Sequence, residues 1–304
     1  MTGSGASARD AHLPGPGEAW NPIKLTRWSG DYLEEKGIED GRLEAEFLLA
    51  HVLRTERLQL YLQFDRPIEK DELARFKSLL QRRLSREPLQ YIVGRTGFRE
   101  IELKTDSRAL IPRPETEILV GEVLAWAETE SEELTGLDLG TGSGAIALSL
   151  LKEGGFRRIV GTDLSEDSLA LAWENAVALE LDDRLELRTG ALFDPVAPGE
   201  HFDVIVSNPP YIPEPDRDGL QPEVRDWEPE GALFAGPEGM DVLVPLVKGA
   251  PNALRQGGLL AVEVGPGQAT PLMAEMERSE VYGQVRSVSD LAGRERIVVG
   301  VASN

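Results

Sequence analysis

The stretch Leu137-Asp-Leu-Gly-Thr-Gly-Ser-Gly-Ala145 joins an apolar strand to an apolar helix through alternating glycines. A glycine has no Cβ, so the backbone can approach a ligand there without side-chain obstruction. Ligands of open α/β sheets lie beyond the carboxyl ends of the strands, which is where this turn falls. Roughly 20 residues later the next strand ends in Gly161-Thr-Asp163, and an acid at that place can accept both hydroxyls of a ribose. The two features predict a nucleotide site.

The glycine spacing alone does not identify the nucleotide. Gly140, Gly142 and Gly144 follow the pattern G-x-G-x-G, whereas the dinucleotide fingerprint is G-x-G-x-x-G. A nicotinamide dinucleotide is therefore disfavoured, because the third glycine is misplaced. The structural alternative is a tight strand–helix turn that binds nothing, and the acid at Asp163 argues against it.

Strands and helices alternate along residues 113–304, as judged from the spacing of apolar residues. The expected strands are Thr135–Leu139, Arg158–Thr162, Arg184–Leu187, Phe202–Ser207, Gly258–Val264 and two more near Val285 and Val298. The expected helices are Thr116–Thr129, Ala145–Leu151, Glu166–Leu179, Met240–Leu254 and Thr270–Arg278. This order predicts an α/β domain with a mostly parallel sheet covered on both faces. The last two strands have no clear helix between them and predict an antiparallel hairpin at one edge.

The chain before residue 113 has a different character. Residues 1–20 are small, polar and rich in glycine and proline, which predicts a disordered tail. Residues 21–90 predict a small domain of short amphipathic helices. Two segments show the helical spacing: Arg42–Leu53, through Leu43, Phe47, Ala50 and Leu53, and Asp71–Leu84, through Leu73, Phe76, Leu79, Leu80 and Leu84. In residues 91–112, Phe98, Ile101 and Leu103 alternate with polar neighbours, which predicts a hairpin linker.

Composition narrows the class of protein. The 304 residues are 41% hydrophobic and 28% charged, as in globular proteins, and no stretch approaches the roughly 18 apolar residues of a membrane span. The chain has no cysteine, which excludes disulfides and thiolate metal sites and fits a reducing cytoplasm. Acids outnumber bases by 53 to 32, and the net charge of −21 disfavours a large nucleic-acid-binding face. The excess acid is explained either by a solvated acidic surface or by a cytoplasm of high salt.

A second motif follows the strand Phe202–Ser207, which runs directly into Asn208-Pro-Pro-Tyr211. The two prolines lack amide donors and stiffen the backbone, so their carbonyls can project at a fixed angle. Such a turn suits the binding of a planar NH2 group. The Asn208 side-chain oxygen and the Pro209 carbonyl can each accept one N–H, while Tyr211 packs against the plane. A proline turn of purely structural use is the alternative, which the upstream glycine turn disfavours.

Together, residues 138–144, Asp163 and Asn208 to Tyr211 resemble the class I methyltransferases that act on amino groups. The resemblance implies a Rossmann-like seven-stranded sheet and the cofactor S-adenosyl-L-methionine. The Asn-Pro-Pro-Tyr element implies methylation of an sp2 nitrogen: adenine N6, guanine N2 or the glutamine amide.

Further segments resemble the release-factor glutamine methyltransferases, and the likeness spans roughly residues 20 to 302. They are Glu87-Pro-Leu-Gln-Tyr-Ile-Val-Gly94, Leu110-Ile-Pro-Arg-Pro-Glu-Thr-Glu117, Glu223, Glu228-Pro229 and Ala232-Leu233. The second segment is the most specific, because the related family that methylates a ribosomal protein has Arg-Ser-Pro in place of its Arg-Pro-Glu core. This resemblance implies methyl transfer to the glutamine N5 in the Gly-Gly-Gln loop of peptide chain release factors. The helical domain would dock that substrate.

The resemblance also implies roles for individual residues. Gly140, Thr141, Gly142, Ser143 and Gly144 would wrap the methionine part of the cofactor, Asp163 would hold the ribose, and Leu192, with Phe193, would lie by the adenine; Asn208 would also contact the cofactor. Asn208, Pro209, Pro210 and Tyr211 would form the catalytic element and hold the glutamine, flanked by Arg113 in the segment Leu110 to Arg113. Many relatives carry an acid where this chain has Gly190-Ala191, so backbone atoms would replace it at the adenine.

Several alternatives stay open at this point. One is an adenine-N6 nucleic-acid methyltransferase, which would need a basic face or a target-recognition domain that the acidic chain does not offer. The others are a methyltransferase of another protein glutamine and a cofactor-binding protein without catalysis. None of His12, His51 and His201 belongs to a motif, and no metal-ligand spacing is present, so no metal is expected. We expect a cytoplasmic monomer with no nucleic-acid or membrane partner.

Overall fold

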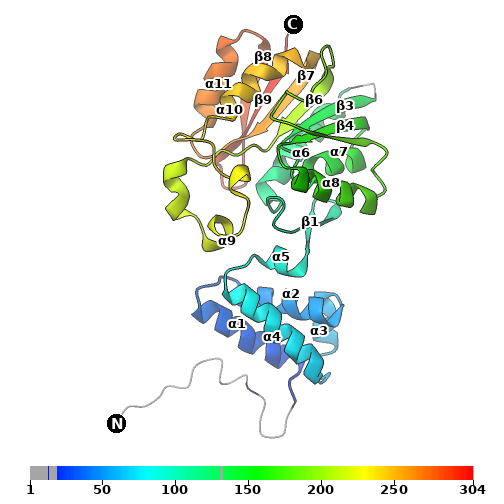
Figure 1. Cartoon of the computed structure of the whole chain (residues 1–304), viewed down its shortest axis with the longest axis vertical. Helices are drawn as coiled ribbons and strands as arrows, with labels where there is room; N and C mark the ends of the chain where they lie inside the picture. Colours follow the sequence, from blue (N-terminus) through cyan, green and yellow to red (C-terminus); the bar gives the residue numbers. More distant parts are fainter. Residues whose placement is uncertain (1–12, 14–18, 131–132, 304) are drawn as a thin grey trace. The chain divides into compact units, whose positions relative to one another are not determined.

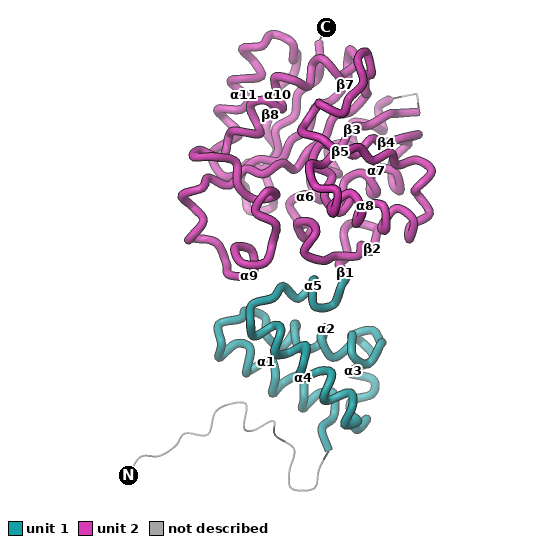
Figure 2. The backbone as a smooth tube through the Cα atoms, viewed as in Figure 1, with its two compact units in different colours: residues 1–94 teal, residues 95–304 magenta. Residues whose placement is uncertain are grey.

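The structure is a computed structural model of the chain that describes residues 13, 19–130 and 133–303. It divides into two compact units, residues 1–94 and residues 95–304, coloured teal and magenta in Figure 2. The predicted disordered tail, residues 1–20, lies almost wholly outside the described residues. The domain boundaries inferred from the sequence, at residues 20, 90 and 112, stay predictions.

The first unit is helical in its described part. Its helices are α1 (Pro22–Glu35), α2 (Gly41–Leu53), α3 (Arg57–Leu62), α4 (Lys70–Leu84) and α5 (Leu89–Val93). Helix α1 begins at Asn21, whose side chain accepts a hydrogen bond from the Lys24 N–H at 2.9 Å, and Pro22 occupies its first position. Fully buried side chains of several helices, among them Leu33, Leu48 and Phe76, form one apolar core.

The apolar series identified in the sequence of α2 is only partly the buried face of this helix. Leu43 and Phe47 are each 39% exposed, whereas Leu48 and Leu49 are fully buried. Apolar residues surround most of α2, so spacing alone does not select a face, and packing against the neighbouring helices decides it. The guanidinium of Arg57 covers the Phe47 ring at 4.7 Å from its centroid.

The second unit begins with the predicted hairpin. Strands β1 (Arg95–Phe98) and β2 (Ile101–Lys104) pair antiparallel. The elements that follow are α6 (Pro114–Ala127), β3 (Leu134–Leu139), α7 (Ala145–Glu153), β4 (Phe156–Asp163), α8 (Glu166–Ala178), β5 (Leu185–Thr189), β6 (Phe202–Ser207), α9 (Pro222–Arg225), α10 (Leu243–Gly249), β7 (Leu254–Glu263), α11 (Ala269–Arg278), β8 (Tyr282–Ser289) and β9 (Glu295–Ala302), with short 3-10 turns at Glu214–Gly219, Glu230–Ala232 and Ala250–Asn252.

Seven strands of the described residues form one sheet in the order β5-β4-β3-β6-β7-β9-β8. Strands β5, β4, β3, β6 and β7 pair parallel with one another, and β9 is antiparallel to both β7 and β8. The predicted mixed sheet with an antiparallel edge hairpin is therefore confirmed.

Helices cover both faces of this sheet, as Figure 1 shows. On one face, buried residues of α6, α7 and α8 share one apolar core with Val204, Val206 and Ala261. On the other face α10 and α11 pack against Ile205 and Leu260. Residues of each central strand belong alternately to the one face and to the other, because successive side chains of a strand point to opposite faces. Burial on both faces explains why these strands are nearly continuous apolar runs.

Helix α10 differs from its prediction. The sequence pattern predicts a helix over Met240–Leu254, but the α-helix ends at Gly249, and Leu254 already begins β7. Pro251 is the physical reason, because it has no N–H donor with which to continue the helical hydrogen bonds. The intervening residues, Ala250–Asn252, form a 3-10 turn.

Candidate active site

The two motifs meet at the switch point of the sheet. From β3 the chain proceeds outward through β4 to β5, and then returns to place β6 on the other side of β3. The last residues of these central strands, Leu139 and Ser207, are register partners, and the Ser207 hydroxyl donates to the Leu139 carbonyl at 2.6 Å. The glycine turn and Asn208 therefore start side by side at the edge where α/β sheets bind ligands.

The glycine turn requires left-handed backbone. Gly140, Gly142 and Gly144 have φ angles of 72°, 55° and 82°, a region that disfavours side chains. A Cβ on Gly140 would have no atom within 4 Å, and one on Gly142 would meet nothing closer than 3.9 Å. A Cβ on Gly144 would instead lie 3.1 Å from Leu148 and 3.3 Å from Ala172. The first two glycines thus border open space, while the third allows helix α8 to pack closely.

Asp138 lies beneath this turn and is fully buried. One carboxyl oxygen accepts hydrogen bonds from the Thr141 hydroxyl at 2.7 Å and the Ala147 N–H at 3.2 Å. Its other oxygen, Oδ1, has no hydrogen-bond partner in the described part of the chain. Burial, with a smaller contribution from the nearby charge of Asp163, raises the pKa of Asp138 to about 7. An unpaired polar atom under an open turn fits a site whose ligand completes the hydrogen bonding.

Asp163 ends β4 next to the glycine turn. Its Oδ2 accepts the Gly142 N–H at 3.0 Å and its Oδ1 accepts the Ser165 N–H at 2.9 Å. A carboxylate offers about four acceptor sites, so these two bonds orient the group and leave capacity for two further donors. Vicinal hydroxyls of a ribose would be such a pair of donors.

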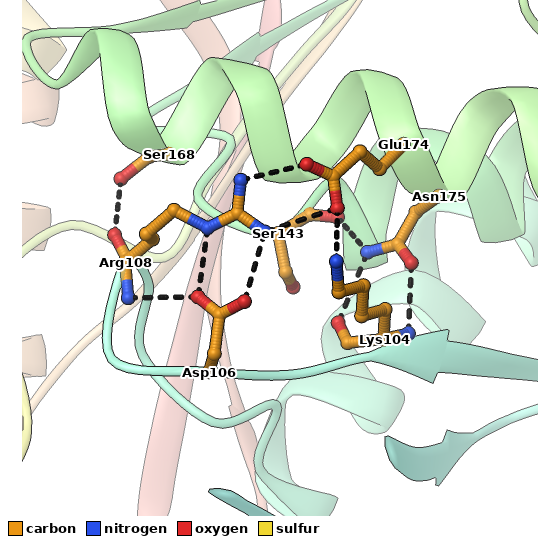
Figure 3. A network of polar contacts seen from close by, with 7 residues as sticks. All are labelled: Lys104, Asp106, Arg108, Ser143, Ser168, Glu174 and Asn175. Carbon is orange, nitrogen blue, oxygen red and sulfur yellow. Dashed lines mark hydrogen bonds and ion pairs between the residues drawn. The ribbon is translucent and has the colours of Figure 1, made fainter. Parts of the chain in front are cut away.

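A polar network supports the turn from the side of α8 (Figure 3). Asn175 is buried, and its amide nitrogen donates to the Ser143 carbonyl at 2.9 Å and to the Lys104 carbonyl at 3.2 Å. Glu174 forms ion pairs with Arg108 and Lys104. The hydrogen bond from Arg108 and, to a smaller extent, that from Lys104 lower the pKa of Glu174 to about 2. The network fastens the glycine turn to the segment that leads from β2 towards Arg113.

The predicted adenine-side residues lie beyond the end of β5. Leu192 has a positive φ of 43°, and both it and Phe193 are partly buried against the core that α10 and α11 cover. The Gly190 N–H donates to the Asp163 carbonyl at 2.9 Å, which places this turn against the end of β4. Gly190-Ala191 contributes no carboxylate here, in keeping with the departure noted in the sequence.

Asn208 is held by a residue of α6. Its amide nitrogen, Nδ2, donates to the Thr116 hydroxyl oxygen at 3.0 Å, and the Thr116 hydroxyl donates to Glu263 Oε2 at 2.7 Å. An amide carries its oxygen and nitrogen on opposite sides of one carbon. With Nδ2 directed at Thr116, the acceptor Oδ1 is directed away from it, which is the arrangement that an NH2-binding motif needs.

Tyr211 shares the same carboxylate. Its hydroxyl donates to Glu263 Oε1 at 3.3 Å, and its carbonyl accepts the Gln268 side-chain N–H at 2.8 Å. Glu263 is 1% exposed at the end of β7. Burial raises the pKa of Glu263 to about 7, and burial is also the largest cause of the raised pKa of Tyr211.

A small pocket of about 70 Å³ opens beside the Asn-Pro-Pro-Tyr turn. Its lining is mainly apolar, with Asn208 and Arg113 as polar groups; the lining residues are Leu110, Arg113, Asn208, Pro209, Tyr211, Ile212, Val224, Ala232 and Leu233. Arg113 pairs with Glu228 at 2.5 Å, and Glu228 also accepts the Ile111 N–H at 3.3 Å. Burial raises the pKa of Glu228, although the Arg113 charge opposes this. Most of the predicted substrate residues therefore border one pocket.

The structure brings most of the predicted site residues to one edge of the sheet, while their roles stay predictions. Sequence reasoning missed Thr116, Glu263 and Gln268. Glu263 carried a usable signal, because it is a single acid that ends an apolar strand at the ligand-binding edge. Among the described residues, no group of three or more histidines, acids or cysteines lies close enough to hold a metal ion. No helix in the same part of the chain has the length and apolar character to cross a membrane.

Comparisons with known proteins agree with this geometry. Residues 24–94 match the family model described as PrmC N-terminal domain, and residues 116–219 match the methyltransferase small domain. A Methyltransferase crystal structure from Pyrococcus furiosus superposes with a TM-score of 0.50 over 66% of this chain and 89% of its own, at 18% identity, and supports the fold alone.

Curated relatives from several bacteria carry the name release factor glutamine methyltransferase, and two of them are compared with this chain. The protein from Rhodopirellula baltica is 38% identical over 92% of this chain and 95% of its own length. The protein from Geobacter sulfurreducens is 41% identical over 93% of this chain and 97% of its own length. Since both similarities extend across the helical unit, the methyltransferase unit and the Asn-Pro-Pro-Tyr turn, the chain belongs to the family of release factor glutamine methyltransferases.

Proposed function

We propose that this chain transfers a methyl group from S-adenosyl-L-methionine to the side-chain amide nitrogen, N5, of the glutamine in the Gly-Gly-Gln loop of a peptide chain release factor. One observation carries the proposal. Asn208, which lines the pocket beside the Asn-Pro-Pro-Tyr turn, is held by Thr116 with its acceptor oxygen directed away from that contact. A side-chain amide offers the planar NH2 group that such an acceptor binds.

The cofactor site is assigned to the switch point. Residues 140–144 would hold the methionine part, where Gly140 and Gly142 border open space, and Asp163 would accept the ribose hydroxyls. Leu192 would lie against the adenine, with backbone atoms near Gly190 taking the place of the acid. S-adenosyl-L-methionine supplies a strongly activated methyl group. The protein has to exclude water and to align the acceptor nitrogen.

The chemistry of an amide defines what the residues of the pocket must do. The nitrogen lone pair is delocalised into the carbonyl, so the nitrogen is a weak nucleophile. Asn208 Oδ1 and the Pro209 carbonyl would each accept one N–H of the substrate, which favours a more tetrahedral nitrogen in the transition state. Tyr211 would pack against the amide plane, and Pro210 would keep the turn rigid. No base is needed before transfer, because the nitrogen becomes positive only as the methyl arrives.

Charge and family membership favour a protein substrate over a nucleic acid. The net charge of −21 would repel the phosphates of DNA or RNA. The helical unit is proposed as the docking domain for the release factor, whose glutamine has to be presented on an extended loop. Translation termination is cytoplasmic, so we place the enzyme in the cytoplasm, and we expect it to act as a monomer.

Mass spectrometry of an unmodified release factor, after incubation with this protein and S-adenosyl-L-methionine, tests the proposal. We expect the gain of one methyl group on the Gly-Gly-Gln glutamine, and none on a release factor in which that glutamine is replaced by glutamate. The assay is run at low and high salt, because the acidic surface requires screening if the cytoplasm is saline. A folded, cofactor-binding protein that methylates nothing at either salt would contradict the proposal, as would methylation of adenine in a parallel assay with nucleic acid.

A further inference from the structure

Three elements far apart in the sequence converge behind the substrate pocket. Glu263 ends β7, Thr116 lies in the first turn of α6, and Asn208 follows β6. Thr116 stands between the other two, at 2.7 Å from Glu263 Oε2 and 3.0 Å from Asn208 Nδ2. Thr116 and Glu263 are 3% and 1% exposed, so water does not compete for these hydrogen bonds.

We call the hydrogen-bonded series Asn208–Thr116–Glu263 the relay. Glu263, its last member, determines the direction of each hydrogen bond. An ionised carboxylate only accepts, so the single proton of the Thr116 hydroxyl is given to Glu263. The Thr116 oxygen can then only accept from Asn208. It therefore faces the amide nitrogen Nδ2, and Oδ1 is left for the substrate. Without the carboxylate, the threonine hydroxyl could equally donate to Oδ1, which would turn the NH2 group of Asn208 towards the pocket.

We propose that Glu263 is a positioning residue of the methyl transfer, which acts through Thr116 to select the end of the Asn208 side chain that meets the substrate amide. The inference rests on the proposed function. Two NH2 groups facing each other cannot form a hydrogen bond, so the wrong orientation of Asn208 would leave the substrate nitrogen misaligned. Glu263 also accepts the Tyr211 hydroxyl, so a single carboxylate orients the first and the last residue of the motif.

The surroundings of Glu263 make its charge sensitive to pH. Burial is the main factor that disfavours the ionised form of Glu263, and the charge of Glu115 in α6 adds to it by repulsion. The hydroxyls of Thr116 and Tyr211 and the charge of Arg296 in β9 stabilise the ionised form. Protonation would let Glu263 donate to Thr116 and release the threonine proton towards Asn208. We therefore expect methyl transfer to lose rate as the pH falls through about 7.

Thr116→Val and Thr116→Ser form a matched pair for the first experiment. Valine keeps the shape of threonine without the hydroxyl, and serine keeps the hydroxyl. We expect T116V to lose roughly 10- to 100-fold in kcat, with little change in the KM for release factor, and T116S to stay within roughly threefold of wild type. Thr135→Val, at a partly buried threonine near the start of β3 whose hydroxyl donates to Asp203 at 2.8 Å, controls for the general effect of the exchange. Thermal unfolding shows whether each variant is folded, and titration with S-adenosyl-L-methionine shows whether it binds the cofactor.

Glu263→Gln provides a second measurement, because glutamine resembles the protonated acid and does not titrate. Wild type should lose kcat at acid pH with a midpoint near 7, and E263Q should be slow at every pH. Wild-type methylation of the release factor establishes the proposed function separately. If wild type is active but T116V matches T116S, or E263Q keeps the wild-type pH profile at the wild-type rate, the positioning role is overturned while the function stands.

Discussion

The Ser207 hydroxyl donates to the Leu139 carbonyl at 2.6 Å, which ties together the last residues of two neighbouring strands. One of these strands leads into the glycine turn and the other into the Asn-Pro-Pro-Tyr turn. A methyl transfer needs the donor and the acceptor nitrogen in line at close range. The fold supplies this alignment by starting both binding turns from adjacent, buried strands, whose relative register is determined by the sheet.

Gly142→Ala and Gly144→Ala should affect different properties. Both glycines have left-handed backbone conformation, with positive φ angles, so replacement of either by alanine costs about 1–2 kcal/mol in backbone strain. The methyl of G142A would enter the open space of the proposed cofactor site, whereas that of G144A would crowd Leu148 and Ala172. We expect G142A to weaken cofactor binding roughly tenfold or more, and G144A to show the larger fall in Tm.

Calorimetric titration of the cofactor and thermal unfolding separate these effects. Gly155→Ala is the control, because its Cβ would meet no atom within 4 Å and its backbone is not left-handed. Equal cofactor affinity of G142A and wild type would contradict the assignment of the glycine turn.

Asn208→Ala should separate binding from catalysis. The variant removes the acceptor for the substrate N–H but leaves the glycine turn and Asp163 intact. We expect turnover to fall by roughly 100-fold or more, with cofactor affinity largely kept. The measurement is single-turnover methylation of a release factor beside a cofactor titration. Unchanged turnover would refute the amide pocket and would favour a different acceptor site.

The sequence was sufficient to predict the order of strands and helices in the second unit, because doubly covered strands and glycine turns leave strong local patterns. It also predicted the two motifs that meet at the switch point. It did not predict the end of α10, where Pro251 overrides an apolar helical pattern. The relay from Thr116 to Glu263 spans 147 residues and exists only through the register of the sheet and the packing of α6, so no local pattern encodes it.

Arg113→Ala should destabilise the pocket wall that Glu228 supports. The Glu228 side chain is 1% exposed and that of Arg113 is 31% exposed, so removal of the arginine leaves a buried carboxylate without its charge partner. We expect a loss of up to about 3 kcal/mol in the free energy of unfolding and a higher KM for the release factor. Urea denaturation and steady-state kinetics measure the two effects.

The double variant Arg113→Ala, Glu228→Gln tests the cause of that loss. Replacement of the carboxyl by an amide removes the buried charge, so the double variant should recover part of the lost stability. If R113A were as stable as wild type, the ion pair would not support the pocket.

The pH dependence of the free energy of unfolding should reveal the titration of Glu263 directly. Its pKa in the folded protein is about 7, above the ordinary 4.5, so the folded state binds this proton more tightly than the unfolded state. The stability that it contributes is present below about pH 4.5 and is lost as the pH rises through 7. Glu263→Gln has no such titration. We therefore expect wild type to lose stability relative to E263Q between pH 5 and pH 8, by on the order of 1–3 kcal/mol.

Urea denaturation at several pH values measures this difference, with Glu277→Gln, at an exposed glutamate of α11, as a control for the exchange itself. Asp138 also has a pKa of about 7, but it is present in both proteins and so cancels in the comparison. The ionised form of Glu263 that orients Asn208 is thus the form that costs stability. A constant difference across this pH range would show that Glu263 titrates normally, and the loss of methylation expected at acid pH would then need another group.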